Sequence, residues 1–449
     1  MVDATGDELD LALLEARTRY AATRPRSLDA HLDACEVMPG GNTRSVLYHG
    51  PFPLRIAHGE GARLIDVDGH EYVDLLGEYT AGLFGHSHPA IRAALDAALD
   101  GGVNLGAHNG FEARLARLIV ERFASIDKVR FTNSGTEANL LALTAARAAT
   151  GRDDVLVFEG GYHGGVLTFG SGPSRVNAPY PVRVATFNDV NGAVAAIDAV
   201  GSDLAAVLVE PMLGSGGCIP ATSSFLQALR RATDRTGAVL VFDEVMTSRS
   251  SPGGAQELYG VTPDLTTLGK YVGGGMSFGA FGGRRELMDQ FDPTRPNALG
   301  HAGTFNNNVL SMAAGITALG EVFTADAARA LADRGDRLRA RLDTRLADVG
   351  GTWCCSGLGS IMNLHPTAGP VGQLADVAGL DDRRRELLFL GLLEEGYYLA
   401  RRGFIALSLV VTDDDLDGFV EAVVRVVTRQ PDPPPAPGRA PSRARSPGA

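Results

Sequence analysis

Lysine is almost absent from this chain. Of the 41 lysine and arginine residues among its 449 residues, only Lys128 and Lys270 are lysine, so arginine supplies nearly all of the positive charge. Arginine stays protonated, whereas a lysine amine can lose its proton and attack a carbonyl carbon. Lys270 lies in the glycine-rich run 266–275 (TTLGKYVGGG). A lysine kept in such a loop is a candidate for forming a Schiff base.

Excess positive charge, cysteine and long apolar runs are scarce as well. The net charge of −12 gives no basic surface for nucleic acid or an anionic membrane. The four cysteines, two of them adjacent, have neither a disulfide pattern nor the spacing of zinc ligands. No apolar run approaches the roughly 18 residues of a membrane span, and the acidic start lacks the features of a signal peptide. We therefore expect a cytoplasmic enzyme that acts on small molecules.

An acidic residue ends the apolar segment upstream of Lys270. Residues 238–242 have the character of a buried strand that leads into Asp243, and residues 265–268 predict the next strand, which leads into the loop of Lys270. Open α/β sheets bind ligands at the carboxyl ends of their strands. Pyridoxal phosphate enzymes need a lysine for the aldehyde and an aspartate that keeps the pyridine nitrogen protonated, so that the ring can accept electrons. Asp243 and Lys270 together predict this cofactor.

A second motif predicts a place for the cofactor's phosphate. Residues 129–139 (VRFTNSGTEAN) indicate a strand that passes through a tight turn into a helix. Ser134 and Glu137 fit a capping box, and small residues leave backbone amides and hydroxyls free at the positive end of the helix. We expect Ser134, Gly135 and Thr136 to form a phosphate cup. The segment has neither the Gly-Lys-Ser/Thr of a Walker loop nor a GxGxxG turn.

Other segments add candidate residues. Tyr162 follows a buried strand within GGYHGG and has room to lie flat on a cofactor ring, although core packing explains it equally well. Arg44 lies in the turn-rich loop 39–45, where a solvated arginine is the ordinary alternative. His86 and His88 have no acid or cysteine at ligand spacing, so we expect no metal site.

The order of predicted elements is that of an α/β protein. Through the middle of the chain short apolar strands alternate with helices, which is typical of a mainly parallel sheet covered by helices on both faces. The last third alternates differently and suggests a smaller α+β domain, and residues 7–35 predict one amphipathic helix. We expect a small domain from both chain ends (1–75 and 320–430), a large cofactor-binding domain (76–319) and a disordered tail (431–449).

Taken together, these motifs resemble the class III aminotransferases, pyridoxal phosphate enzymes of fold type I. The matching segments are Asn133–Ala138, Gly161–Gly164, Glu210-Pro211, Phe242–Val245, Leu268–Lys270 and Gly303–Asn306. Gly41–Leu47 and Arg402–Leu409 resemble the β-amino-acid branch, the β-phenylalanine aminotransferases. The resemblance implies transamination of an aromatic β-amino acid with 2-oxoglutarate, giving a β-keto acid and glutamate.

The resemblance also implies what the matched residues do. Lys270 would bind the cofactor's aldehyde and then move a proton between two carbon atoms, and Asp243 would pair with the pyridinium nitrogen. Val245 and Tyr162 would pack on opposite faces of the ring. Glu210 belongs to the same cofactor-binding set.

The cofactor's phosphate is expected to lie between two chains. By resemblance, Ser134, Gly135 and Thr136 would hold it from one subunit, and Thr304 would reach it from the second. The resemblance therefore implies a homodimer with its active sites at the interface, whose substrates are an amino acid donor and an α-keto acid acceptor.

Two arginines are candidates for substrate binding. One site must accept two substrates in turn, and the carboxylate of a β-amino acid lies one carbon further from the amine than the α-carboxylate of glutamate. Arginine holds a carboxylate through two parallel hydrogen bonds. We expect Arg44 and Arg402 to line two pockets, one for each carboxylate, with the assignment of substrates left open and with Arg401 as the alternative to Arg402.

Two other interpretations follow from related families. Glutamate-1-semialdehyde 2,1-aminomutases share most of these motifs, but they have Gly-Gly-Val-Asn-Ser-Pro near the first arginine and Pro-Ser-x-Phe-Glu near the C-terminus. This chain has Gly-Gly-Asn-Thr-Arg-Ser and Arg-Arg-Gly-Phe at those places. A non-catalytic regulator built on this fold would be expected to have an added basic DNA-binding module.

Overall fold

The computed structural model describes residues 4–170 and 174–431. Within them the largest sheet has seven strands, and the adjacent pairs are parallel except where β12 runs antiparallel to both neighbours. In spatial order the strands are β4 (Lys128–Thr132), β12 (Gly279–Gly283), β11 (Leu265–Gly269), β10 (Val239–Asp243), β7 (Leu204–Val209), β5 (Asp154–Phe158) and β6 (Val182–Ala185). The predicted mainly parallel sheet is confirmed.

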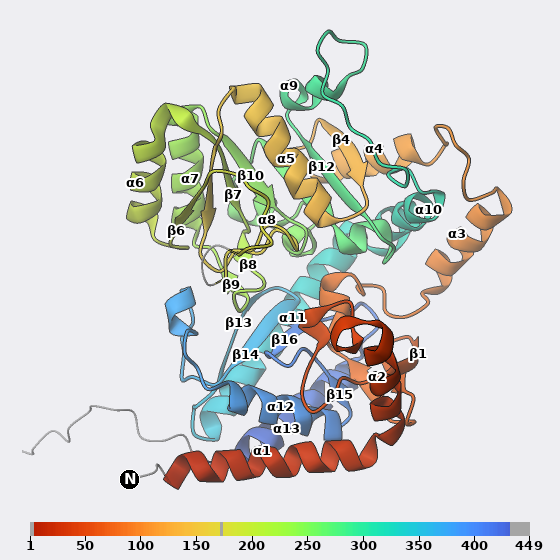
Figure 1. Ribbon diagram of the computed structural model, residues 1–449, viewed down its shortest axis with the longest axis vertical. Helices are drawn as coiled ribbons and strands as arrows, with labels where there is room; N and C mark the ends of the chain where they lie inside the picture. The colour runs from red at the N-terminus through yellow and green to blue at the C-terminus, as the bar shows by residue number, and fades with distance from the viewer. Residues whose placement is uncertain (1–3, 171–173, 432–449) are drawn as a thin grey trace, which may run out of the picture.

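Helices cover both faces of this sheet, which occupies the upper half of Figure 1. The main covering helices are α5 (Gly135–Thr150), α6 (Val190–Val200) and α7 (Ser223–Thr236). Along β10, Val239 and Val241 pack with α5, whereas Leu240 and Phe242 pack with α6 and α7. Successive side chains of a strand point to opposite faces, so a strand covered on both sides is apolar throughout. This explains the continuous apolar run before Asp243.

The two ends of the chain meet in the lower half of Figure 1. A four-stranded sheet consists of β1 (Ile56–Glu60), β2 (Arg63–Asp66), β3 (Glu71–Asp74) and β15 (Tyr397–Tyr398), and a three-stranded sheet consists of β13 (Cys354–Leu358), β14 (Ile361–His365) and β16 (Phe404–Ala406). The neighbouring helices are α11 (Ala325–Asp348), α12 (Asp382–Glu394) and α13 (Asp413–Thr428). Because β15 pairs in parallel with β3, residues some 320 positions apart share one sheet.

The predicted single helix over residues 7–35 is wrong. The chain forms α1 (Ala4–Thr23) and α2 (Pro25–Val37), and Arg24 between them has a non-helical conformation. Proline lacks an amide hydrogen and disfavours the helical conformation of the residue before it, although it is well placed at the first position of a new helix. Pro25 therefore ends one helix and begins the next.

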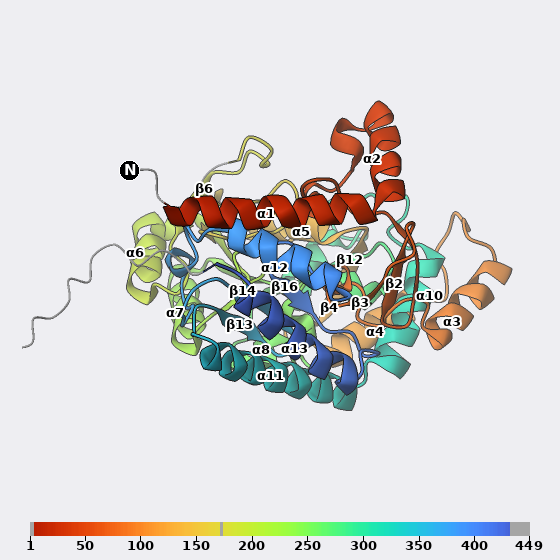
Figure 2. The same cartoon turned by 90° about the horizontal axis from the view of Figure 1, so that it is seen from below.

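The first helix lies along α12, as Figure 2 shows from below. Leu13 and Tyr20 are buried in the same cluster as Leu390. At the edge of this contact, the Arg17 Nε donates to Glu386 Oε1 at 2.6 Å. The N-terminal helix thus packs on a helix from the last quarter of the chain.

The remaining elements connect these two groups. They are α3 (Pro89–Asp100), α4 (Glu112–Arg122), β8 (Met212–Leu213), β9 (Ile219–Pro220), α8 (Ala255–Tyr259), α9 (Arg285–Met288) and α10 (Val309–Thr317). Directly after α10 the chain continues as a π-helical turn, Ala318–Val322. No single helix of the described residues is long and apolar enough to cross a membrane; Val309–Val322 and α11, bent by 78°, meet that requirement only as a pair.

In the small three-stranded sheet β13 pairs antiparallel with β14, although cysteine, serine and glycine interrupt the apolar pattern of β13. The predicted disordered tail lies, apart from Pro431, outside the described residues.

Candidate active site

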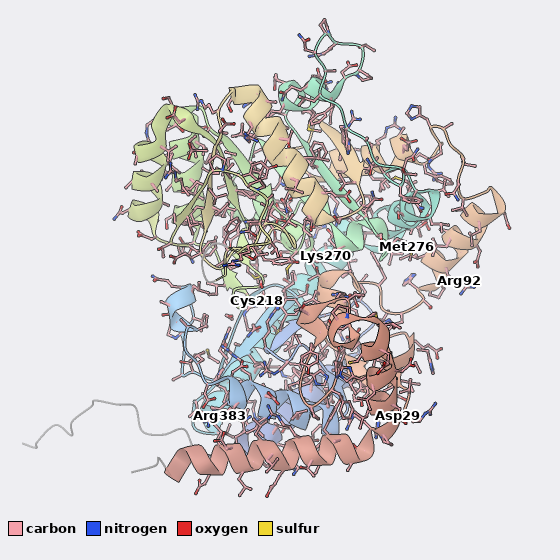
Figure 3. All side chains as sticks on the ribbon, viewed as in Figure 1. Asp29, Arg92, Cys218, Lys270, Met276 and Arg383 are labelled. Atoms are coloured by element: carbon pink, nitrogen blue, oxygen red, sulfur yellow. The ribbon has the colours of Figure 1, made fainter. Side chains whose placement is uncertain are left out.

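Lys270 directly follows β11 and lies between the two halves of the molecule (Figure 3). It lines a cavity of 280 Å³. Burial lowers the pKa of its amine to about 8; the carboxylates of Asp243 and Glu210 act against this, and Arg402 and Arg44 lower it further. A larger share of the amine is therefore unprotonated near neutral pH than in an ordinary lysine, which is the form that attacks a carbonyl carbon.

The backbone helps to place this side chain. Lys270 has a φ of +55°, in the left-handed region that residues with a side chain seldom adopt. The strand therefore ends abruptly at Gly269, and a 3₁₀ turn (Lys270–Gly273) follows. Most of the other predicted site residues line the same cavity; they are Ser134, Gly135, Thr136, Tyr162, Glu210, Asp243 and Val245.

Asp243 ends β10 among hydrogen-bond donors. Its Oδ2 accepts from Asn139 Nδ2 at 2.8 Å and lies 2.8 Å from His163 Nδ1, and its Oδ1 accepts from the amide of Val245 at 3.0 Å. Burial alone raises the pKa of this carboxyl, but the hydrogen bonds and the nearby His163 outweigh burial and hold the pKa below its ordinary value. Asp243 is thus an ionised, buried carboxylate at the floor of the cavity.

His163 and Asn139 are not among the predicted site residues, although both lie inside the motifs that contain predicted ones. Besides contacting Asp243, Asn139 donates to the backbone oxygen of His163 at 3.0 Å and accepts from the Thr267 hydroxyl at 2.8 Å. One amide therefore connects α5, β10, β11 and the loop after β5. The available signal is an asparagine on the otherwise alanine- and leucine-rich face of α5, where only 1% of it is exposed.

Glu210 directly follows β7 and holds the loop of Tyr162. Its Oε1 accepts from the amide of Tyr162 at 2.9 Å and its Oε2 from the amide of Gly214 at 3.1 Å. Burial raises the pKa of Glu210 to about 7, with His163 lowering it and Asp243 raising it. Glu210 therefore fixes the backbone from which the exposed Tyr162 ring projects.

The N-terminus of α5 forms a cradle without room for additional carbon atoms. A Cβ at Gly135 would lie 2.8 Å from Val245 Cγ2, and a Cβ at Gly164 would lie 2.2 Å from Thr136 Oγ1. The amides of Gly135 and Thr136 belong to the first turn, which has no acceptor within the helix. Small residues and free amides at a helix N-terminus suit a phosphate group. The cradle thus fits the phosphate of pyridoxal phosphate.

The predicted capping box is half right. The Ser134 hydroxyl accepts from the Glu137 amide at 3.2 Å, as predicted. The Glu137 carboxylate, however, accepts from the amide of Asn133 at 2.9 Å, one residue before the N-cap. The turn therefore closes one residue earlier than in a standard box.

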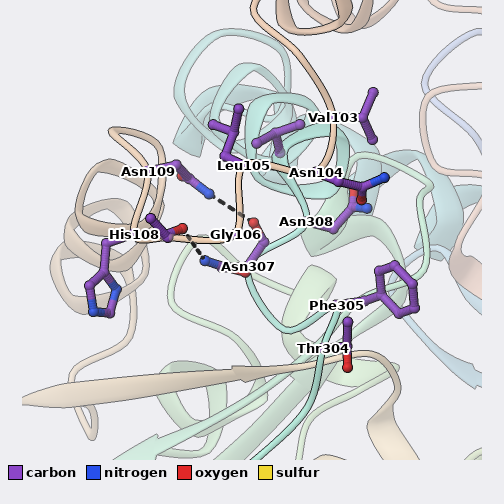
Figure 4. Close-up of a pocket in the computed structure, with 12 residues that line it drawn as sticks. Val103, Asn104, Leu105, Gly106, His108, Asn109, Thr304, Phe305, Asn307 and Asn308 are labelled. Carbon is purple, nitrogen blue, oxygen red and sulfur yellow. Dashed lines mark hydrogen bonds between the residues drawn. The ribbon is translucent and has the colours of Figure 1, made fainter.

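Thr304 lies apart from the other predicted cofactor residues. It is exposed in the loop before α10 and lines a different cavity, of 630 Å³. Figure 4 places Thr304 and Phe305 at one end of this cavity, with residues 103–109 around the other. A single chain therefore does not bring Thr304 to Lys270.

Arg44 and Arg402, the two predicted substrate arginines, both lie beside the ring of Tyr79. The guanidinium carbons of Arg44 and Arg402 lie 5.8 and 5.2 Å from the centroid of the Tyr79 ring. Arg402 also lies 5.4 Å from the ring of Phe404, and its buried Nε has no hydrogen-bond partner among the described residues. Arg44 forms an ion pair with Glu78.

Arg401 forms ion pairs with two carboxylates of α12. Its Nη2 lies 2.5 Å from Asp382 Oδ2 and 2.9 Å from Glu386 Oε2. Arg402, in contrast, is close enough to Lys270 to contribute to the lowered pKa of that amine. Of the two neighbours, the geometry favours Arg402 for a ligand in the site.

An acidic side chain lies beside His86. His86 Nε2 lies 3.1 Å from Asp74 Oδ2. Within residues 4–170 and 174–431 no group of three histidine, cysteine or acidic side chains is arranged to hold a metal ion.

Fold and cavity define an enzyme of fold type I that depends on pyridoxal phosphate, and comparisons with known proteins specify its class. The model of the class-III aminotransferases matches residues 47–427. The chain is 54% identical to a β-phenylalanine transaminase of Variovorax paradoxus over 92% of this chain and 95% of the relative. It is also 38% identical to glutamate-1-semialdehyde 2,1-aminomutase 2 of Brevibacillus brevis, over 89% and 97%.

The fold agrees with these relationships. The crystal structure of a β-phenylalanine aminotransferase from Variovorax paradoxus superposes with a TM-score of 0.92 at 53% identity, covering 93% of this chain and 97% of that one. The chain therefore belongs to the class-III aminotransferases. The predicted fold class, enzyme class and cofactor are confirmed.

Proposed function

We propose that this aminotransferase takes the amino group of an aromatic β-amino acid such as β-phenylalanine and passes it to 2-oxoglutarate, giving a β-keto acid and glutamate. The 54% identity over nearly the whole chain supports this substrate class. The observation that carries the proposal is the pair of guanidinium groups on Tyr79, both within electrostatic reach of Lys270. We assign the enzyme to the cytoplasm.

When bound, pyridoxal phosphate supplies an aldehyde and a ring that accepts the electron pair left by a broken C–H bond. We assign Lys270 to the aldehyde and to the movement of the proton. The ionised Asp243 keeps the ring nitrogen protonated. Val245 and Tyr162 hold opposite faces of the ring, and Glu210 fixes the backbone of Tyr162.

The phosphate belongs in the cradle of Ser134, Gly135 and Thr136, with Thr304 of the partner subunit completing it. Two observations support a homodimer. Thr304 lies away from the cavity of its own chain, and the exposed side chain of Phe305 beside it leaves an apolar group for a second copy to cover.

Mixed dimers test this assignment. Thr304→Ala should weaken cofactor affinity by about 1.5 to 3 kcal/mol, the scale of a hydrogen bond to a charged group. In a hybrid of Thr304→Ala and Lys270→Ala chains, action across the interface leaves one site intact and one with both changes. About half of the activity should then return at limiting cofactor. If every hybrid site is defective, Thr304 acts within its own chain.

The domain arrangement is proposed as residues 1–75 and 320–430 forming a small domain and residues 76–319 forming the large one. The pairing of β15 with β3 supports a small domain from both chain ends. Limited proteolysis should release fragments that end near residues 75 and 320, and fragments ending inside the seven-stranded sheet would contradict these boundaries.

Kinetics of two arginine variants test the substrate proposal. With β-phenylalanine and 2-oxoglutarate varied separately, Arg44→Ala and Arg402→Ala should each lose about ten- to one-hundred-fold in affinity, because each loses a charge-assisted contact with a carboxylate. The pattern across the two substrates should differ between the variants. Arg19→Ala is the control, because this arginine of α1 is solvent-exposed and pairs with Glu394 of α12. Equal, small effects on both substrates would rule out recognition by these arginines.

Intramolecular transfer, as in an aminomutase, is the alternative, and the 38% identity to an aminomutase supports it. Incubation of the loaded enzyme with β-phenylalanine alone separates the two functions. A transaminase should convert the bound aldehyde to its amine form and release a stoichiometric amount of β-keto acid. An aminomutase working on a single substrate should need no keto acid and should not respond to β-phenylalanine.

A further inference from the structure

Arg44 already holds a carboxylate of its own chain. The ion pair with Glu78 occupies the group that we assign to a substrate carboxylate. Both side chains are open to solvent, with 42% of Arg44 and 53% of Glu78 exposed. Exposed ion pairs are weak, so another carboxylate can exchange with Glu78.

The backbone that presents Glu78 is unusual. Glu78, Tyr79 and Thr80 have φ values of +47°, +52° and +82°, three consecutive residues other than glycine in the left-handed region. Such conformations persist only where the surroundings hold them, and they gather at functional sites. Gly77 holds this segment close, because a Cβ there would lie 2.7 Å from the Ala406 oxygen. The segment therefore has a fixed shape.

This segment brings both an aromatic ring and a carboxylate to Arg44. The Tyr79 ring lies beside both Arg44 and Arg402, whereas the carboxylate next to it in sequence pairs with Arg44. Glu78 also lines a cavity of 650 Å³ that shares Met276 with the cavity of Lys270. Figure 3 places Met276 close to Lys270. Glu78 thus lines a cavity that adjoins the cavity of Lys270.

The charges have a consequence for ligands. With Glu78 in place, Arg44 offers little net charge to an incoming molecule, and a carboxylate must displace Glu78 to bind. An uncharged group that enters the same pocket meets the Arg44–Glu78 ion pair. Without Glu78 it would have to desolvate an unpaired guanidinium group, which is unfavourable. The pair therefore weakens selection for anionic ligands at this pocket.

We propose that Glu78 determines substrate specificity by competing with the substrate carboxylate for Arg44. This inference rests on the function proposed for Arg44. The displaced Glu78 turns back to solvent, and it returns to Arg44 when the carboxylate leaves. Its charge therefore sets how strongly the pocket prefers a carboxylate over a neutral group of the same shape.

Two inhibitors of equal shape test this in the cofactor-loaded enzyme. 3-Phenylpropanoate is β-phenylalanine without its amine, and 3-phenylpropanamide is the uncharged counterpart. Glu78→Gln should lower the inhibition constant of the anion about two- to five-fold, the range of an exposed ion pair, and should leave that of the amide unchanged or raise it. For β-phenylalanine, KM should fall if its carboxylate is the one that binds Arg44, while kcat stays the same.

Control variants distinguish a failure of this inference from a failure of the function proposed for Arg44. Glu71→Gln removes a carboxylate from an exposed ion pair with Arg63 in the neighbouring sheet and should change neither constant. In the Arg44→Ala background, Glu78→Gln should have no effect on the anion. If Glu78→Gln leaves the anion's inhibition constant unchanged or raises it, Glu78 does not compete, and the inference is overturned. If Arg44→Ala itself leaves that constant unchanged, the function proposed for Arg44 falls first.

Discussion

Removing the amine of Lys270 should stabilise the cofactor-free protein. The pKa of this lysine is 10.5 when unperturbed and about 8 in the folded chain, since burial disfavours its charged form. The unfolded state therefore binds the proton more tightly, and stability rises with pH between these two values. At pH 7 the folded state loses about 3 kcal/mol to this effect, and at pH 9.5 about 1 kcal/mol.

Thermal unfolding of Lys270→Met measures this cost, because methionine is similarly long and uncharged. A chain of 449 residues has an unfolding entropy of about 0.9 kcal/mol per kelvin, so the variant should melt about 3–4 °C above the wild type at pH 7. The gap should shrink by more than half at pH 9.5. Lys128→Met, which removes the other lysine from an ion pair with Asp289, is the matched control and should not melt higher. A gap that is absent at pH 7, or independent of pH, would refute the reasoning.

Further variants test the cavity floor and the phosphate cradle. His163→Phe should raise the pKa of Asp243, because it removes a neighbour that holds the carboxyl ionised; we expect about a ten-fold loss in kcat and an acid limb of the pH–rate profile shifted to higher pH. Asp243→Asn should keep the cofactor bound but slow the half-reaction with the amino donor, and an unchanged rate would make Asp243 merely structural. Gly135→Ala should weaken cofactor affinity by about 1–3 kcal/mol in equilibrium titration, since its Cβ would lie 2.8 Å from Val245 Cγ2; full affinity would show that the cradle can widen.

The site residues at the ends of β10 and β11 could be predicted, because the end of a buried strand can be located from its apolar residues. Asp243 ends a continuous apolar run and Lys270 follows the short buried strand β11, and parallel strands bring their carboxyl ends to one edge of the sheet. The helix cap at Ser134 was predictable for a similar reason, because capping depends on a few neighbouring residues. These features are local in sequence, and the roles assigned to them came from their chemistry and from family resemblance.

Contacts between distant segments could not be predicted in this way. His163 lies 80 residues before its partner Asp243, and nothing in the sequence indicates which carboxylate it meets. The pairing of Glu78 with Arg44 depends on three left-handed residues that no propensity favours. The break at Pro25, in contrast, has a local signal in the proline itself, but apolar residues continue at helical spacing on both sides of it and favour a single helix.

Because lysine is scarce, acylation of side-chain amines can measure how much of the enzyme lacks its cofactor. Lys128 is half-buried on the edge strand β4, where it pairs with Asp289, and Lys270 lines the cavity. If Lys270 holds the aldehyde as proposed, its nitrogen is engaged in a loaded molecule, so an acylating reagent meets one side-chain amine. A cofactor-free molecule offers a second one, and its pKa of about 8 makes it react faster at neutral pH than an ordinary lysine. The mass of the labelled protein would therefore report the fraction of empty sites in a preparation.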